Sequence, residues 1–84
     1  MWHMYVVECS DLTLYTGITT NVMRRIKEHN TSTRGAKYTR ARRPVKLLYE
    51  KEYLDRSSAS KAEYKFKKLN RKEKLKIITL CEGE

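Results

Sequence analysis

Two residues that can bind phosphate and move protons lie on the apolar side of a predicted helix. The helix begins after Thr19 or Thr20, either of which can cap it, and runs to about Asn30. At about 100° per residue, His29 falls inside the apolar stripe and Arg25 borders it. A guanidinium is costly to bury unless it is paired with an anion, so Arg25 is a candidate for binding one. The structural alternative is a core histidine bonded to a backbone carbonyl and an arginine that extends to water.

A carboxylate stands in a similar position on a second predicted helix, Ser57–Leu69. Glu63 lies at the edge of that helix's apolar stripe. Ser60 and Glu63 have capping-box spacing, which would give Glu63 a structural role at the helix start. Asp55 offers an earlier cap, which would place Glu63 inside the helix and leave its carboxylate available for a role in the functional site. Asn70 lies on the same side further along, but it begins an Asn-Arg-Lys-Glu capping box and is assigned a structural role.

Two tyrosines and a glycine complete the candidate site. A hairpin turn centred on Ser10 would place Tyr5 opposite Tyr15, with their Cβ atoms about 5 Å apart. Gly17 follows on the same face as Tyr15, where a strand gains nothing structural from glycine, so we expect another group to approach its backbone closely. Tyrosine pairs alone are usually packing. Together with Arg25 and a nearby glutamate, they suit a cleft that processes phosphate esters.

Three strands and three helices must position these residues. Strands are predicted at Met4–Val7, Leu12–Ile18 and Val45–Tyr49, and a last helix follows Asn70 and runs through Cys81. The element order is β-β-α-β-α-α, with a polar loop at residues 31–35. We therefore predict one domain over residues 1–84, of the α/β (α+β) class, with at least two antiparallel strands covered by helices on one or both faces.

The charge of the chain indicates its partner. There are 19 Lys and Arg against 10 Asp and Glu, a formal net charge of +9, which favours polyanions. The apolar runs are far shorter than the ~20 residues that span a bilayer, and no signal-peptide pattern is present. Cys9 and Cys81 lack disulfide or zinc spacing and are expected to be reduced and buried. We expect a cytoplasmic protein that binds nucleic acid rather than membrane.

A cationic segment at residues 34–46 is the candidate binding surface. It contains no acid, and Tyr38 within it can stack on an exposed base. A second basic run at residues 61–76 adds eight Lys and Arg, of which Lys74 and Lys76 are interpreted as part of a solvated helix face. The cations of the segment are Arg34, Lys37, Arg40, Arg42, Arg43 and Lys46.

These motifs resemble the GIY-YIG nuclease superfamily. His3-Met4-Tyr5 stands at the first family motif, without its Gly and Ile, and Tyr15-Thr16-Gly17 stands at the second. Arg25 matches the family's phosphate-contacting arginine, and His29 a position with His or Tyr in many members. Glu63 matches the metal-binding glutamate. The stretches 14–20, 24–25, 28–30 and 35–40 more closely resemble the small stand-alone UPF0213-type members, and the likeness runs from about residue 2 to residue 75.

The resemblance implies a GIY-YIG domain with a three-stranded, largely antiparallel sheet flanked by helices. It implies a metal-dependent endonuclease in which Glu63 holds one Mg²⁺ or Mn²⁺ and Arg25 contacts the scissile phosphate. Tyr5 is assigned as general base, with Tyr15 and His29 orienting water or relaying the proton, and the two tyrosines could exchange roles. DNA, possibly single-stranded, is favoured over RNA, with low sequence specificity. The alternative is a non-catalytic nucleic-acid-binding module with the same fold.

Overall fold

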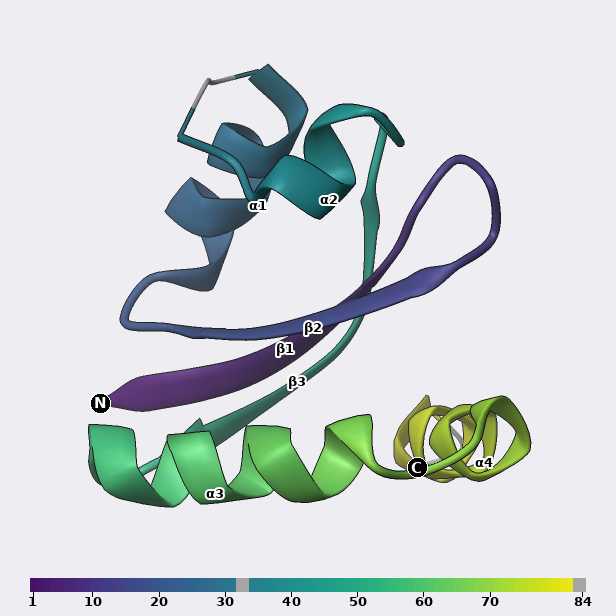
Figure 1. Ribbon diagram of the computed structural model, residues 1–84. Helices are drawn as coiled ribbons and strands as arrows, with labels where there is room; N and C mark the ends of the chain where they lie inside the picture. The colour runs from purple at the N-terminus through teal and green to yellow at the C-terminus, as the bar shows by residue number, and fades with distance from the viewer. Residues whose placement is uncertain (32–33, 83–84) are drawn as a thin grey trace.

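The computed structural model describes residues 1–31 and 34–82, and within them a three-stranded sheet separates two layers of helices (Figure 1). The strands are β1 (Trp2–Glu8), β2 (Leu14–Thr19) and β3 (Lys46–Tyr53). Their order is β2-β1-β3, and both neighbouring pairs are antiparallel. The α+β architecture expected from the sequence is confirmed.

The middle strand β1 is buried on both faces. Tyr5 and Val7 face one apolar cluster, and Met4 and Val6 face the other. None of these four side chains exceeds 3% exposure. Because strand side chains alternate between faces, the phenol of Tyr5 is carried into the interior together with its hydroxyl. That hydroxyl requires hydrogen-bond partners within the protein.

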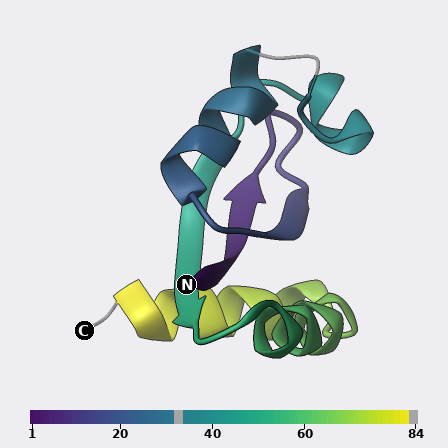
Figure 2. The same ribbon diagram turned by 90° about the vertical axis from the view of Figure 1, so that its left-hand side faces the viewer.

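The helices divide between the two faces of the sheet. Helices α1 (Val22–Thr31) and α2 (Lys37–Arg40) lie on one side, and α3 (Arg56–Lys67) and α4 (Arg71–Glu82) lie on the other (Figures 1 and 2). The short helix α2 was not expected, because a single basic turn carries no helical periodicity. Cys9 is buried as expected, whereas positions 32–33 of the predicted loop and the side chain of Cys81 lie outside the described residues.

Helix α1 begins one or two residues later than the sequence suggested. Asn21 Oδ1 accepts the Arg24 backbone N–H at 3.0 Å, so Asn21 caps the helix. The prediction of Thr19 or Thr20 as cap was wrong. The Thr19 hydroxyl instead accepts the Asn21 N–H at 3.1 Å and so shapes the turn that precedes the cap.

Side chains cap both of the last two helices, and the cap of α3 determines where Glu63 lies within that helix. Asp55 Oδ1 accepts the Ser58 N–H at 2.8 Å and caps α3, so Ser60 to Glu63 is not a capping box and Glu63 lies well inside the helix. Asn70 and Glu73 form the predicted capping box of α4. The Asn70 N–H donates to Glu73 Oε1 at 3.1 Å, and the Glu73 N–H donates to Asn70 Oδ1 at 2.9 Å.

The hairpin register differs from the expected one by two residues. Tyr5 pairs with Gly17, and Tyr15 pairs with Val7, so the predicted pairing of the two tyrosines was wrong. The turn is longer because Leu12 adopts a positive φ of 69° and Asp11 accepts hydrogen bonds from both the N–H and the hydroxyl of the residue two positions on. Leu12 therefore belongs to the turn and not to the strand.

Gly17 provides space for the ring of Tyr5. A Cβ atom at Gly17 would lie 2.6 Å from the Tyr5 hydroxyl oxygen and 2.8 Å from Cζ. The backbone of Gly17 has no positive φ, so its need for glycine comes from the neighbouring ring alone. The close approach expected at this residue is therefore made by the protein's own tyrosine.

We predict that Gly17→Ala destabilises the fold by roughly 1–3 kcal/mol, because the buried ring cannot move aside. Without the ring, alanine in a strand should instead gain about 0.5–1 kcal/mol over glycine. Urea unfolding measures the difference. In a Tyr5→Leu background the same glycine change should cost little, and an equal cost in both backgrounds would contradict the explanation.

Candidate functional site

The Tyr5 hydroxyl is the centre of a buried hydrogen-bond network. It lies 2.7 Å from His29 Nε2. His29 is itself fully buried, and its Nδ1 lies 2.7 Å from Thr39 Oγ1. Thr39 is also fully buried, and its hydroxyl donates to the Ala36 carbonyl at 2.9 Å. The network therefore runs from β1 through α1 to α2.

The direction of each hydrogen bond follows from the count of protons. The buried Tyr5 proton has one described acceptor, His29 Nε2, which must then carry a lone pair. The His29 proton therefore sits on Nδ1 and is donated to Thr39 Oγ1. At the other end, the only Thr39 hydroxyl proton is directed to the Ala36 carbonyl, which leaves Oγ1 as an acceptor. The Tyr5 end and the Thr39 end of the hydrogen-bond network therefore assign the same tautomer to His29.

Burial keeps both members of the Tyr5–His29 pair neutral. Desolvation raises the pKa of Tyr5 to about 12, although Arg25 acts against it. Desolvation also lowers the pKa of His29 to about 4, with Arg25 acting in the same direction. At neutral pH the resting pair is therefore a phenol that donates to a neutral imidazole.

Arg25 is directed at the same hydroxyl from α1. Its Nη1 donates to Glu28 Oε1 at 3.1 Å and to the Arg34 carbonyl at 2.8 Å, and the guanidinium is close enough to the Tyr5 hydroxyl for each group to shift the pKa of the other. Desolvation is the largest single effect and lowers the pKa of Arg25, but the interactions with Glu28 and Tyr5 together outweigh it, so the pKa is raised. A fixed guanidinium at a buried phenol suits an anionic group that arrives beside it.

Glu63 acts on this site from the opposite layer of helices. Its side chain is 22% exposed, and its carboxylate forms a long ion pair of 3.5 Å with Lys67 one turn along α3. Its charge is close enough to Tyr5 to contribute to the raised pKa of that phenol. Of the predicted site residues, His29 thus contacts Tyr5 directly, and the charges of Arg25 and Glu63 affect the pKa of its phenol.

Tyr15 lies beside the network and not within its hydrogen bonds. Its ring meets the edge of the His29 ring with centroids 5.4 Å apart, and it stacks near Tyr38 at 6.0 Å. The Arg42 guanidinium lies 3.9 Å from the Tyr38 centroid. Tyr38 is 39% exposed, so these rings extend from the buried histidine toward the surface.

The segment at residues 34–46 approaches α1 unusually closely. A Cβ at Gly35 would lie 2.8 Å from the Glu28 carbonyl oxygen and 3.0 Å from the Cα of His29. This approach lets Thr39 reach the imidazole. Arg43 Nε donates to the His29 carbonyl, and so binds the end of α1.

The cations of this segment differ in what their side chains contact. Arg42 donates to Asp11 at 3.0 Å and to the Tyr38 carbonyl at 2.9 Å. Arg42 and Arg43 therefore both make contacts within the protein, and phosphate binding by them stays a prediction. Lys37 and Arg40 are exposed on α2, as are Arg34 and Lys46 on either side of it.

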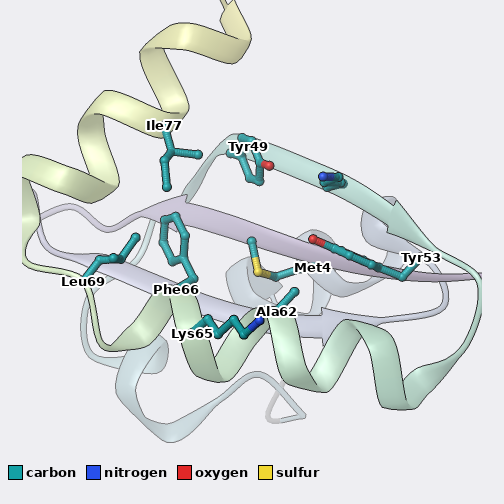
Figure 3. Close-up of a pocket in the computed structure, with 9 residues that line it drawn as sticks. Met4, Tyr49, Tyr53, Ala62, Lys65, Phe66, Leu69 and Ile77 are labelled. Carbon is teal, nitrogen blue, oxygen red and sulfur yellow. The ribbon is translucent and has the colours of Figure 1, made fainter.

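A pocket of about 300 Å³ lies on the other face of the sheet and does not belong to this site (Figure 3). Its lining is mainly apolar and includes Met4, Tyr53 and Phe66. Lys51 and Lys65 also line the pocket. Met4 and Phe66 belong to the cluster under α3 and α4, whereas Tyr5 faces α1.

Sequence reasoning missed three residues that build the site. Glu28 lies three positions after Arg25 on one helix, a spacing that could have indicated the ion pair. Gly35 and Thr39 gave no local signal, since their contacts with α1 depend on how the following segment folds back.

Comparison with known proteins identifies the family. The family model described as the GIY-YIG catalytic domain matches residues 1–76. The chain belongs to the GIY-YIG family. A UPF0213 protein of Desulfotalea psychrophila is 54% identical over 81 residues, covering 96% of this chain and 74% of the relative. One from Streptococcus agalactiae is 57% identical over 82 residues, covering 98% and 92%.

Solved structures of similar proteins have the same fold. The solution structure of an E. faecalis protein is 43% identical, with a TM-score of 0.65 over 98% of this chain and 86% of that one. A UPF0213 protein of Bacillus halodurans is 42% identical, with a TM-score of 0.61 over 95% and 85%. The GIY-YIG family is a nuclease family, which supports nucleic acid as substrate. In residues 1–31 and 34–82 no helix has the length and apolar character to cross a bilayer.

The buried neutral histidine predicts how stability depends on pH. The pKa of His29 is about 4 in the folded protein, against an ordinary value of 6.5. Between these two pH values the unfolded chain binds a proton at His29 and the folded chain does not. Stability should fall as pH falls through this window, by about 2 kcal/mol between about pH 7 and pH 5. His29→Gln should remove this component and His3→Gln should retain it, as measured by urea unfolding at each pH. A wild-type profile unaffected by His29→Gln would contradict the assignment.

Proposed function

We propose that this GIY-YIG chain is a divalent-metal-dependent endonuclease that hydrolyses phosphodiester bonds, in DNA in preference to RNA and with low sequence specificity. The observation that carries the proposal is the buried Tyr5 hydroxyl, which is hydrogen-bonded to His29 and lies within the electrostatic reach of Arg25 and Glu63. A protein that only bound nucleic acid would have no need to bury a phenol against a histidine within reach of a guanidinium and a carboxylate.

Arg25 supplies the positive charge for the substrate. Its guanidinium carries donors in a planar fork that matches phosphate oxygens. It is held by Glu28 and by the Arg34 carbonyl, so little reorganisation is needed when the phosphate arrives. Its positive charge stabilises the negative charge that accumulates as the phosphodiester approaches the transition state.

Tyr5 and His29 handle the proton of the attacking water. Burial raises the pKa of Tyr5 and lowers that of His29, so the resting pair is a neutral phenol and a neutral imidazole, not a phenolate and an imidazolium. The transfer is therefore coupled to attack: the water proton moves to the Tyr5 oxygen while the Tyr5 proton moves to His29 Nε2. Tyr5 remains the general base, and the proton ends on His29. Tyr15, beside the His29 ring, is the alternative base.

Glu63 is the candidate ligand for one Mg²⁺ or Mn²⁺. Its carboxylate offers hard oxygen donors, is partly exposed, and is only loosely paired with Lys67. A single protein carboxylate, completed by waters and substrate phosphate oxygens, is a common way to hold Mg²⁺. Such an ion, when bound, neutralises charge on the phosphate and assists the departing oxygen.

Binding of the nucleic acid is assigned to the exposed cations around α2. Lys37 and Arg40 are exposed there, next to Tyr38, whose ring is available in part for stacking. Phosphate contacts of this kind position a strand without reading its sequence. This is the basis for proposing low sequence specificity.

The metal role predicts a separation of binding from cleavage. Glu63→Gln retains size and helix propensity but removes the charge that holds a hard cation. We expect an unchanged melting temperature, nucleic-acid binding at least as tight as wild type, and cleavage slower by about a hundredfold or more with Mg²⁺ or Mn²⁺. The assay uses labelled single- and double-stranded DNA and RNA.

Glu73→Gln is the matched control, because Glu73 belongs to a capping box in which glutamine still serves. It should cleave at the wild-type rate. Full activity in Glu63→Gln would reject the metal role. A wild-type protein that binds these nucleic acids but cleaves none of them with either ion would identify a non-catalytic binding module.

The binding surface predicts a salt dependence. Contact with about four phosphates gives a slope of about −3 to −4 for log K against log salt. Replacing Lys37 and Arg40 together with alanine should flatten it by about 1 to 2. Lys74→Ala with Lys76→Ala removes the same charge from α4 and should leave the slope near wild type. Equal effects from both pairs would mean that only net charge matters.

A further inference from the structure

Thr39 has no role in the proposed chemistry so far, yet it is built into the site. It is fully buried although its neighbours Lys37, Tyr38 and Arg40 are exposed. A buried hydroxyl in a one-turn helix on the surface must be held there by its contacts. Those contacts are His29 Nδ1 at 2.7 Å and the Ala36 carbonyl at 2.9 Å.

We propose that Thr39 is a positioning residue of the site, because its hydroxyl accepts the Nδ1 proton of His29 and thereby presents the Nε2 lone pair to Tyr5. A neutral imidazole has one N–H, so the group that accepts it decides which nitrogen is left as an acceptor. The Thr39 proton is directed to the Ala36 carbonyl, which leaves the hydroxyl oxygen as the acceptor. The opposite tautomer would leave the buried Tyr5 proton without a described acceptor.

The position of Thr39 is set by the close approach of its segment to α1. At Gly35 there is no room for a side chain between the segment and the Glu28 carbonyl. The Thr39 N–H donates to the Ala36 carbonyl at 3.0 Å, which forms the turn that directs the side chain inward. On the other side, Arg42 binds Asp11 in the β1–β2 turn and accepts the Ser10 N–H at its carbonyl. The hydroxyl is therefore fixed from both ends.

The tautomer itself does not depend on any catalytic role, whereas its consequence for rate rests on the proposed nuclease function. In the reaction, the Tyr5 O–H bond breaks toward His29 Nε2 as the water proton bonds to the Tyr5 oxygen. The Nδ1 proton stays where it is, hydrogen-bonded to Thr39. A histidine in the other tautomer has no lone pair at Nε2 and cannot accept this proton.

The tautomer can be measured directly in the full chain. Long-range ¹H–¹⁵N NMR of the uniformly labelled protein at about pH 7 distinguishes protonated from unprotonated ring nitrogens. The sequence has two histidines, so His3 serves as an internal reference that does not contact Thr39. We expect His29 to be protonated at Nδ1 and unprotonated at Nε2. A wild-type protein with the proton on Nε2 would overturn the proposal, whether or not any variant folds.

Thr39→Val and Thr39→Ser form the matched pair of variants. Valine keeps the shape without the hydroxyl, and serine keeps the hydroxyl. Thr39→Ser should retain the wild-type nitrogen shifts of His29, whereas Thr39→Val should lose the exclusive Nδ1–H state. A folded Thr39→Val protein with unchanged His29 shifts would contradict the positioning role.

Kinetics test the consequence on the DNA substrates of the cleavage assay. Thr39→Val should lower kcat roughly 10- to 100-fold with little change in KM, and Thr39→Ser should restore most of it. In a His29→Gln background, Thr39→Val should cause no further loss. An unchanged kcat in Thr39→Val would overturn the catalytic consequence. If the wild type does not cleave, the nuclease proposal fails, and the NMR measurement still decides the tautomer assignment.

Discussion

A phenol hydroxyl buried on the middle strand of the sheet is the constraint on which the site depends. An unpaired buried polar group costs on the order of 1–3 kcal/mol, so the fold must supply partners for Tyr5. His29 supplies the hydrogen-bond acceptor and Arg25 a nearby positive charge, both from α1. This explains why two polar residues stand on the inner side of that helix. Their place follows from the strand beneath them, whose alternation directs Tyr5 toward α1.

The same burial determines the electrical state of the resting site. Desolvation is the largest effect on the pKa of Tyr5 and raises it; the carboxylate of Glu63 adds to this effect, and the guanidinium of Arg25 opposes it. A neutral phenol and a neutral imidazole therefore face each other until new charge arrives. A phosphodiester or a cation brings such charge, and a change of about 1.4 kcal/mol corresponds to one pKa unit. Hydrolysis under the proposed mechanism thus requires a loaded site, because the protein alone holds the proton on Tyr5.

The sequence predicted the parts of the fold that depend on local periodicity and capping. Helical spacing placed His29 and Arg25 on the inner side of α1, and the Asn70–Glu73 box began α4 as expected. It missed what depends on backbone conformation or on contacts between segments. The positive φ of Leu12 lengthened the turn and moved Tyr5 opposite Gly17. Thr39 could not be predicted because its role arises only when the segment after α1 folds back.

The segment around α2 connects nucleic-acid binding to the proton network through its two sides. Thr39 faces inward to His29, while the neighbouring cations face solvent. The Tyr38 ring lies near Tyr15, which in turn meets the His29 ring. A strand bound by phosphate contacts to the exposed side of α2 would therefore lie within a few side chains of the Tyr5 hydroxyl. Because those contacts carry no base information, the chemistry would be positioned by the backbone of the substrate and not by its sequence.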